Sequence, residues 1–234
     1  MEPQINFIDS CASTNSAIPS DAPHGFAIAC REQTAGRGQR GASWESEPGM
    51  NVTMSVMLRP EGLRAAGQFL ISMHTALAVA RTLDSYGIAG VRVKWPNDVY
   101  VGNRKICGIL IENSLSGSMV SRSVCGIGLN VNQTEFRSPA PNPVSMAMLT
   151  GLRYDVSEVA TRLFRELLAP YPTLADYHAR LWRHDGNAWP WVTADGQRIT
   201  APIDRVEPTG HIIIAGHPYA FKEIWPADLT DPSR

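Results

Sequence analysis

The sequence predicts an α+β protein in two parts, a mixed α/β domain over residues 1–184 and a small β domain over residues 185–234. Over the first part, strand-like and helix-like segments alternate. From about Asp185 onward, only short β-like runs follow, separated by turn signals such as Asp195-Gly196 and Thr209-Gly210. A length of 234 residues suits one or two domains.

The elements of the first part are assigned from the spacing of apolar residues. Alternation and short apolar runs indicate strands, whereas the apolar positions between Phe69 and Leu83 have helical spacing and end near Gly87, a suitable C-cap. Residues 9–16 are rich in helix-capping types. The expected strands are Ile5–Ile8, Phe26–Cys30, Asn51–Leu58, Lys105–Glu112 and Val120–Leu129, and the further expected helices are Val156–Leu168 and Leu174–Trp182.

The second part is expected to form a small antiparallel barrel of ~50 residues. A unit of this size has too little core to be secure alone, so we expect it to pack on the larger domain. Its strand-like runs are Trp189–Val192, Gln197–Ile203, His211–Ala215 and Pro218–Ile224.

Composition excludes several functional classes. A formal charge of −1 argues against a general nucleic-acid or membrane-surface binder, because such proteins usually carry a basic excess. No window approaches the ~20 apolar residues that span a bilayer, and the first residues lack the pattern of a secretion signal. The four cysteines, Cys11, Cys30, Cys107 and Cys125, show no metal-ligand spacing. We therefore expect buried, reduced thiols in a cytoplasmic protein.

The least ordinary segment is the glycine-arginine loop from Gln33 to Trp44. Its glycines allow backbone amides to approach an anion, and Arg37 and Arg40 supply donors that suit phosphate. A tryptophan at the end of such a loop can stack on adenine or cover an apolar ligand. The spacing is not that of a P-loop. From the residues alone, a flexible surface turn with solvated arginines explains the segment equally well.

A second segment joins Lys94–Asp98 to the strand Lys105–Glu112. Pro96 interrupts the first strand, which places Asn97 and Asp98 in a turn at its end. A carboxylate there can hold Mg²⁺ with a phosphate substrate, or the pair can simply cap the turn. Lys105 begins an apolar strand, where it is either an ordinary exposed lysine or a charge that stabilises a carboxylate and a phosphate.

A third segment, Gly126–Asn132, is a strand that runs into a turn and contains two glycines. Close approach of a ligand needs such glycines, but so does tight sheet packing. Alone, this segment is a weak signal.

Taken together and in order, these segments resemble the biotin protein ligase family over nearly the whole chain. The tail Ala220–Ile224 is similar to the family's small SH3-like C-terminal domain, so the resemblance implies a biotin- and ATP-binding catalytic domain over residues 1–184 and an SH3-like domain over residues 185–234. The matching segments are Ser13-Thr14-Asn15, Gln33 with Gly36–Gly41, Lys94–Asp98, Lys105–Glu112 and Gly126–Asn132.

The resemblance implies a two-step reaction with biotin, ATP and Mg²⁺. The carboxylate of biotin attacks the α-phosphate of ATP, and a lysine of a biotin carboxyl carrier protein domain then accepts the biotinyl group from biotinyl-5′-AMP. Such chemistry needs no enzyme nucleophile, because positioning and charge neutralisation carry it.

The resemblance also implies roles for individual residues. Arg37 and Lys105 are the expected catalytic residues, both acting on the reacting carboxylate and phosphate. The implied biotin-binding residues are Ser13, Thr14, Asn15, Gln33, Gly36, Arg37, Gly38, Gln39, Lys105 and Gly108. The implied ATP-binding residues are Arg37, Arg40, Trp44, Asn97, Lys105 and Asn130, with Asp98 serving Mg²⁺.

One position departs from the family pattern: Gln39 stands where the family loop often has arginine. Glutamine keeps hydrogen bonding but loses the charge, so we expect a weaker grip on the adenylate or a compensating cation elsewhere.

Three other functions are alternatives to this one. A lipoate–protein ligase has a related fold and chemistry, but the arginine-glycine loop and Lys94–Asp98 favour biotin. A non-catalytic protein-binding module fits poorly with the intact Arg37 and Lys105. Family members that repress transcription carry a DNA-binding domain before the Ser-Thr-Asn motif, which starts here at Ser13, so we expect a ligase without specific DNA binding. Relatives occur as monomers and as homodimers, and the sequence leaves both open.

Overall fold

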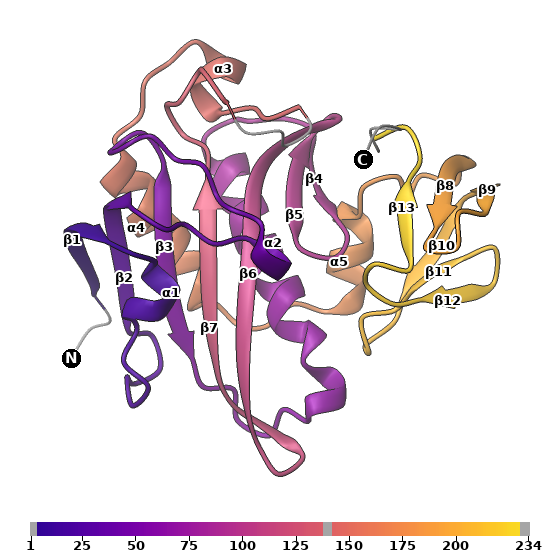
Figure 1. Cartoon of the computed structure of the whole chain (residues 1–234), viewed down its shortest axis with the longest axis horizontal. Coiled ribbons are helices and arrows are strands. Elements are labelled where there is room, and N and C mark those ends of the chain that lie inside the picture. The colour runs from indigo at the N-terminus through magenta and orange to yellow at the C-terminus, as the bar shows by residue number, and fades with distance from the viewer. Residues whose placement is uncertain (1–3, 138–141, 230–234) are drawn as a thin grey trace.

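The computed structural model of the chain describes residues 4–137 and 142–229, and it has a seven-stranded mixed sheet at its centre (Figure 1). The strand order is β1-β2-β3-β7-β6-β5-β4; β1 and β2 run parallel, and all other neighbours are antiparallel. The strands are β1 (Ile5–Cys11), β2 (Ala27–Gln33), β3 (Val52–Leu58), β4 (Val91–Lys94), β5 (Asp98–Val101), β6 (Arg104–Ser116) and β7 (Met119–Leu129).

One face of the sheet is covered by the long helix α2 and by α4, which pack against each other and on the strands. Twelve of the 17 residues of α2 are buried, as expected for a helix enclosed on most sides. The helices are α1 (Thr14–Ala17), α2 (Phe69–Ser85), α3 (Met146–Thr150), α4 (Val156–Leu167) and α5 (Leu174–Arg180), with 3-10 turns at Gln39–Gly41 and Ala65–Gly67.

The opposite face of the sheet carries α1. Because side chains alternate between the two faces of a strand, neighbouring residues of β7 identify the two sides. Cys125 faces Thr75 of α2, whereas a side chain at Gly126 would meet Asn15 of α1. The same alternation along β6 puts Gly108, which pairs with Gly128, on the α1 side.

The C-terminal part forms two three-stranded antiparallel sheets, with orders β10-β11-β12 and β13-β8-β9. The expected small β domain is thus confirmed, but within residues 185–229 its strands do not close into one barrel. Pro202 separates β9 from β10 and interrupts the backbone pairing between the two sheets. The strands are β8 (Trp189–Thr193), β9 (Arg198–Ala201), β10 (Ile203–Val206), β11 (Ile212–Ile214), β12 (His217–Tyr219) and β13 (Ile224–Pro226).

The two parts pack together, as expected from the small size of the second one. Trp95 donates a hydrogen bond from Nε1 to the carbonyl of Gly210 at 2.9 Å, and its ring meets Phe221 edge-on. The buried guanidinium of Arg183 pairs with Asp228. The division of the chain between residues 184 and 185 stays a prediction.

The sequence missed the hairpin of β4 and β5, because each strand has only four residues and a Trp-Pro-Asn turn joins them.

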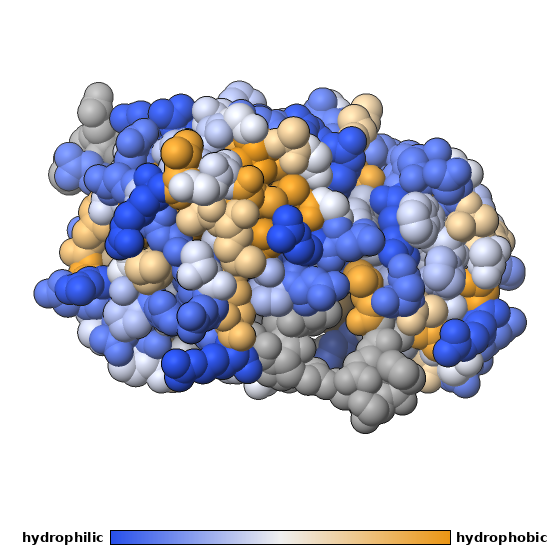
Figure 2. Space-filling model, turned by 90° about the horizontal axis from the view of Figure 1, so that it is seen from above, coloured by the Kyte–Doolittle hydropathy of each residue, from blue (hydrophilic) through white to orange (hydrophobic). Residues whose placement is uncertain are grey.

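The four cysteines are free thiols; three are buried as expected, and Cys11 is half-exposed. No helix within the described residues is long and apolar enough to cross a membrane. The surface seen from above Figure 1 is mostly hydrophilic, with hydrophobic residues gathered toward the middle of that face (Figure 2).

Candidate functional site

A cleft of about 280 Å³ lies on the α1 side of the sheet. Its walls come from five separate stretches of the first part and from one C-terminal turn. It is lined by Ser13, Thr14, Asn15, Gln33, Arg37, Gly38, Gln39, Ala42, Ser43, Trp44, Lys94, Pro96, Asn97, Asp98, Lys105, Gly108, Ile109, Leu110, Gly126, Ile127, Gly128, Phe221 and Lys222.

One end of the cleft is a network of uncharged polar groups around α1. Gln33 accepts hydrogen bonds through Oε1 from the backbone amide of Thr14 at 2.8 Å and from its hydroxyl at 3.2 Å. The hydroxyl of Ser55, which is fully buried in β3, lies 2.7 Å from the hydroxyl of Thr14 and 2.6 Å from Oδ1 of Asn15. These contacts fix the side chains of α1 against the sheet.

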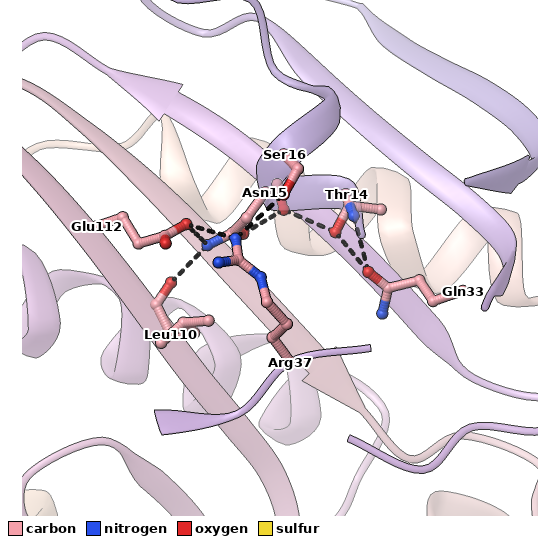
Figure 3. Close-up of polar contacts among 8 residues, drawn as sticks. Thr14, Asn15, Ser16, Gln33, Arg37, Leu110 and Glu112 are labelled. Atoms are coloured by element: carbon pink, nitrogen blue, oxygen red, sulfur yellow. Dashed lines mark hydrogen bonds and ion pairs between the residues drawn. The ribbon is translucent and has the colours of Figure 1, made fainter. Parts of the chain in front are cut away.

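Arg37 reaches from its loop to the same network (Figure 3). Its Nη2 lies 3.1 Å from Oε2 of Glu112 and 3.2 Å from the hydroxyl of Ser16. The same Glu112 oxygen accepts a hydrogen bond from Asn15 Nδ2 at 2.7 Å. Both charged side chains are close to half-exposed, so the pair is screened by water and an anionic ligand can compete with it.

Glycines of β6 and β7 make room for the groups that enclose the cleft. A Cβ atom at Gly128 would lie 2.5 Å from Nε1 and 2.6 Å from Cζ2 of Trp44, and one at Gly108 would lie 2.8 Å from Cζ3 of the same ring. The indole therefore rests directly on the backbone of two paired strands. A side chain at either position would displace the indole. Gly128, one of the two glycines in Gly126–Asn132, therefore makes room for the Trp44 ring.

The other end of the cleft is charged. Lys105 pairs with Asp98 at 2.7 Å, and its ammonium lies 5.8 Å from the centre of the Trp44 ring. Asn97 donates a hydrogen bond from its amide to the carbonyl of Ile109, which anchors the turn before Asp98 to β6. Burial lowers the pKa of the Lys94 ammonium, only partly offset by Asp98.

The structure brings together most of the residues singled out from the sequence. Gly36 supports the loop, because its carbonyl accepts the amide of Trp44 and a Cβ there would lie 2.7 Å from the Trp44 carbonyl oxygen. Asn130 is buried outside the cleft lining and donates to the carbonyl of Val144. The side chain of Arg40 lies outside the described part of the structure. Those that line the cleft are Ser13, Thr14, Asn15, Gln33, Arg37, Gly38, Gln39, Trp44, Asn97, Asp98, Lys105 and Gly108.

Sequence reasoning gave no role to Ser55, Glu112, Lys94 or Lys222. A serine within the buried strand Val52–Leu58 was a usable signal, since a buried hydroxyl needs a partner. Within the described residues, no group of three or more histidine, cysteine or acidic side chains has the geometry to hold a metal ion by itself.

Comparison with known proteins agrees with this geometry. The family model described as "Biotin/lipoate A/B protein ligase family" matches residues 6–130, more than half of the chain. The chain belongs to this family. The matched residues run from the first strand to the end of β7, so they include every wall of the cleft except the C-terminal turn with Phe221 and Lys222.

Among related sequences of this biotin/lipoate ligase family, the biotin–[acetyl-CoA-carboxylase] ligase of Paracoccus denitrificans is 36% identical over 75% of this chain and 72% of that protein. The one of Mycobacterium tuberculosis is 31% identical over 76% and 70%. The match to the bifunctional ligase/repressor BirA of Bacillus subtilis is 36% identical but spans only 49% of this chain and 35% of that protein.

Solved structures share the fold. The biotin protein ligase from Aquifex aeolicus in complex with biotin and ATP superimposes with a TM-score of 0.76 at 22% identity, covering 94% of this chain and 97% of that chain. The biotin acetyl coenzyme A carboxylase synthetase from Helicobacter pylori, with bound biotinylated ATP, gives 0.63 at 21% identity over 92% and 98%. The agreement includes the C-terminal part, which the family model does not match.

Proposed function

We propose that this protein is a biotin ligase that converts biotin and ATP to biotinyl-5′-AMP and transfers the biotinyl group to a lysine of a biotin carboxyl carrier protein domain. The observation that carries the proposal is the division of one cleft into an uncharged polar end around Thr14 and Gln33 and a charged end around Lys105, with the cation Arg37 held beside the polar network by Glu112. Biotin has the same division, with a neutral ureido ring at one end and a carboxylate at the other.

The polar end suits the ureido ring, which carries two N–H donors and one carbonyl acceptor. Thr14, Asn15 and Gln33 offer both donors and acceptors, held in place by Ser55. Groups fixed before binding lose little conformational entropy when the ligand arrives, which favours affinity. In this assignment Ser13 and Gly38 complete the wall, and Gly108 lets the ligand approach the sheet.

The cationic end suits the reacting carboxylate and the α-phosphate. Arg37 and Lys105 are each held by a carboxylate, Glu112 and Asp98 respectively. Binding of the two anionic groups would exchange these partners, so that the cations neutralise charge where the new bond forms. Trp44 and Asn97 then serve the nucleotide, together with Arg40, whereas Asn130 is buried outside the cleft lining and would reach the nucleotide only after a rearrangement.

A magnesium site fits this end of the cleft. Mg²⁺ is usually held by one or two carboxylates together with substrate phosphates, and Asp98 is the carboxylate that lines the cleft in the described structure. When bound, the ion would neutralise phosphate charge. Asp98 would hold it after release from Lys105.

In the second step, the acceptor lysine attacks the biotinyl carbonyl as a neutral amine, the carbon–nitrogen bond forms, and AMP leaves with the electron pair of the broken anhydride bond. The acceptor is a carrier domain of a carboxylase, and we place the reaction in the cytoplasm. Lys105 stays close to the departing phosphate and stabilises its charge.

Biotin-dependent exchange of labelled pyrophosphate into ATP tests the activation step, with lipoate in a parallel reaction. We expect exchange with biotin only, and a loss of at least about 100-fold in Arg37→Ala and Lys105→Ala, since each removes a charge from the reacting centre. Arg104→Ala, next to Lys105 but exposed, is the matched control and should keep full exchange. Exchange with lipoate alone, or full exchange in both site variants, would show that the proposed function is wrong.

A further inference from the structure

Lysine is confined to the cleft in this protein. Of the 21 lysines and arginines, only three are lysines, at positions 94, 105 and 222. All three line the cleft, although they come from β4, β6 and the turn before β13. The other 18 basic residues are arginines, so arginine is the cation of this chain everywhere else. A compact ammonium is thus used only where the proposed substrates bind.

The charges of the cleft are unevenly balanced. Arg37 and Lys105 each have a carboxylate partner, at 3.1 Å and 2.7 Å. Among residues 4–137 and 142–229, Lys94 and Lys222 have no acidic partner and no side-chain hydrogen bond. The unneutralised positive charge of the cleft therefore lies at these two lysines.

Lys94 is an unusual position for an unpaired charge. It is half-buried, directly opposite Asp98 in the β4–β5 hairpin, yet Asp98 pairs with Lys105 instead. Its ammonium lies 5.4 Å from the centre of the Tyr100 ring, and burial together with the nearby Lys105 and Arg183 lowers its pKa. A cation withdrawn from water without a directly paired carboxylate is unfavourable, and Asp98, whose charge acts on Lys94, is already paired with Lys105, so a ligand anion suits this site.

Lys222 reaches the cleft from the C-terminal part. It lies in the turn between β12 and β13 with φ +68°, a left-handed conformation that is uncommon for a residue with a side chain. Strained backbone of this kind concentrates at functional sites. Its ammonium is 5.8 Å from the ring of Phe221, which also lines the cleft.

We propose that Lys94 and Lys222 bind the β- and γ-phosphates of ATP, the group that leaves as pyrophosphate. The inference rests on the proposed function, in which Arg37 and Lys105 serve the carboxylate and the α-phosphate. In that step a bond forms between a biotin carboxylate oxygen and the α-phosphorus, and the bond from the α-phosphorus to the bridging oxygen breaks. Pyrophosphate departs with that electron pair and carries most of the negative charge, which two ammonium groups neutralise as point charges.

The C-terminal part thereby takes part in activation. Lys94 ends a strand of the sheet and Lys222 belongs to the C-terminal turn, so the leaving group bridges the two parts of the chain.

Three lysines make the proposal directly observable. Protein labelled with ¹³C-lysine gives three side-chain signals, each assigned by its disappearance in Lys94→Arg, Lys105→Arg or Lys222→Arg. Titration with magnesium pyrophosphate should shift the signals of Lys94 and Lys222, and sodium sulfate at equal ionic strength should not. A shift confined to Lys105, or equal shifts with sulfate, would overturn the proposal. This readout does not require biotin chemistry, so it is independent of the proposed function.

Pyrophosphate exchange gives the kinetic counterpart. Lys94→Met and Lys222→Met should each raise the KM for pyrophosphate and ATP about tenfold or more, while the KM for biotin changes less than about twofold. Lys94→Arg should restore most of the loss, because it restores the charge. If both Met variants exchange normally and only transfer to the acceptor slows, the two lysines serve the carrier domain and the proposal is wrong. Absence of biotin-dependent exchange in the unmodified protein would instead refute the proposed function.

Discussion

A single methyl group at Gly126 should disable the polar end of the cleft. Gly126 of β7 lies beneath Asn15, and a Cβ atom there would be 2.9 Å from Cγ and 3.1 Å from Nδ2 of that side chain, and closer still to Oδ1. Ordinary contacts between such atoms are about 3.5–4.0 Å, so the Asn15 amide must move by about 1 Å. Gly126→Ala therefore changes one position in the sheet and displaces a residue of the proposed biotin site.

The cost follows from the hydrogen bonds that Asn15 would lose. The bond from Ser55 at 2.6 Å joins neutral groups and contributes about 1 kcal/mol, while the bond to the Glu112 carboxylate at 2.7 Å contributes about 1.5–3 kcal/mol. Alanine restricts the unfolded chain relative to glycine and returns about 0.5–1 kcal/mol. We expect the free energy of unfolding to fall by about 1.5–3.5 kcal/mol and the Kd for biotin to rise about 30-fold or more.

Urea denaturation and calorimetric titration with biotin measure the two effects. Gly67→Ala is the matched control, since its Cβ would lie an ordinary 3.4 Å from Leu63 Cδ1 and outside the cleft. It should change the free energy of unfolding by less than about 0.5 kcal/mol and leave biotin binding unchanged. Biotin binding of normal strength in Gly126→Ala would refute the assignment of Asn15 to the site.

Three further changes test the cleft and its supports. Gln39→Arg adds a charge to the cleft wall and should slow dissociation of biotinyl-AMP in a chase with unlabelled biotin and ATP; an unchanged rate would contradict the role given to this position. Arg183→Met should lower the free energy of unfolding by about 1–3 kcal/mol, because Arg183 is buried between two tryptophans and paired with Asp228. Arg183 holds the pKa of Asp228 below its usual range, so this stabilisation is present above about pH 4 and lost as pH falls through the folded pKa; urea titrations below pH 4 should therefore show a smaller pH slope in the variant. Burial lowers the pKa of His74, so the unfolded chain binds the proton first and stability should fall below about pH 6.5; an equal fall in His74→Leu would exclude this cause.

How far the sequence predicts this fold depends on the strength of local patterns. Alternation placed β3, β6 and β7 within a few residues of their observed bounds, and apolar spacing placed α2. The β4–β5 hairpin was not predicted, because its four-residue strands are too short to show a pattern. These strands are buried by packing against α2 and β6. The sequence predicted a single barrel, because residues 197–203 look like one continuous strand in a hydropathy pattern. In the structure, Pro202 divides this run into β9 and β10.

Site residues that lie in a sequence motif could be predicted. Residues that reach the site only through the pairing of strands could not. Arg37 and Lys105 lie in segments with recognisable patterns. Their partners depend on strand pairing: Glu112 reaches Asn15 across 97 residues of sequence only because β3, β7 and β6 are adjacent. Lys222 belongs to a segment whose local sequence suggests only a small β domain, and only the packing of the two parts brings it to the cleft that Lys94 also lines.

The mass of an acceptor protein tests most directly whether this cleft activates and transfers biotin. An apo biotin carboxyl carrier domain, incubated with the full chain, ATP, Mg²⁺ and either biotin or lipoate, is measured by intact-mass spectrometry. We predict the addition of one biotinyl group at a single lysine, with no lipoyl addition, and loss of labelling in Arg37→Ala and Lys105→Ala. An unmodified acceptor, a lipoylated acceptor, or full labelling by both variants would contradict the claim that this cleft activates and transfers biotin.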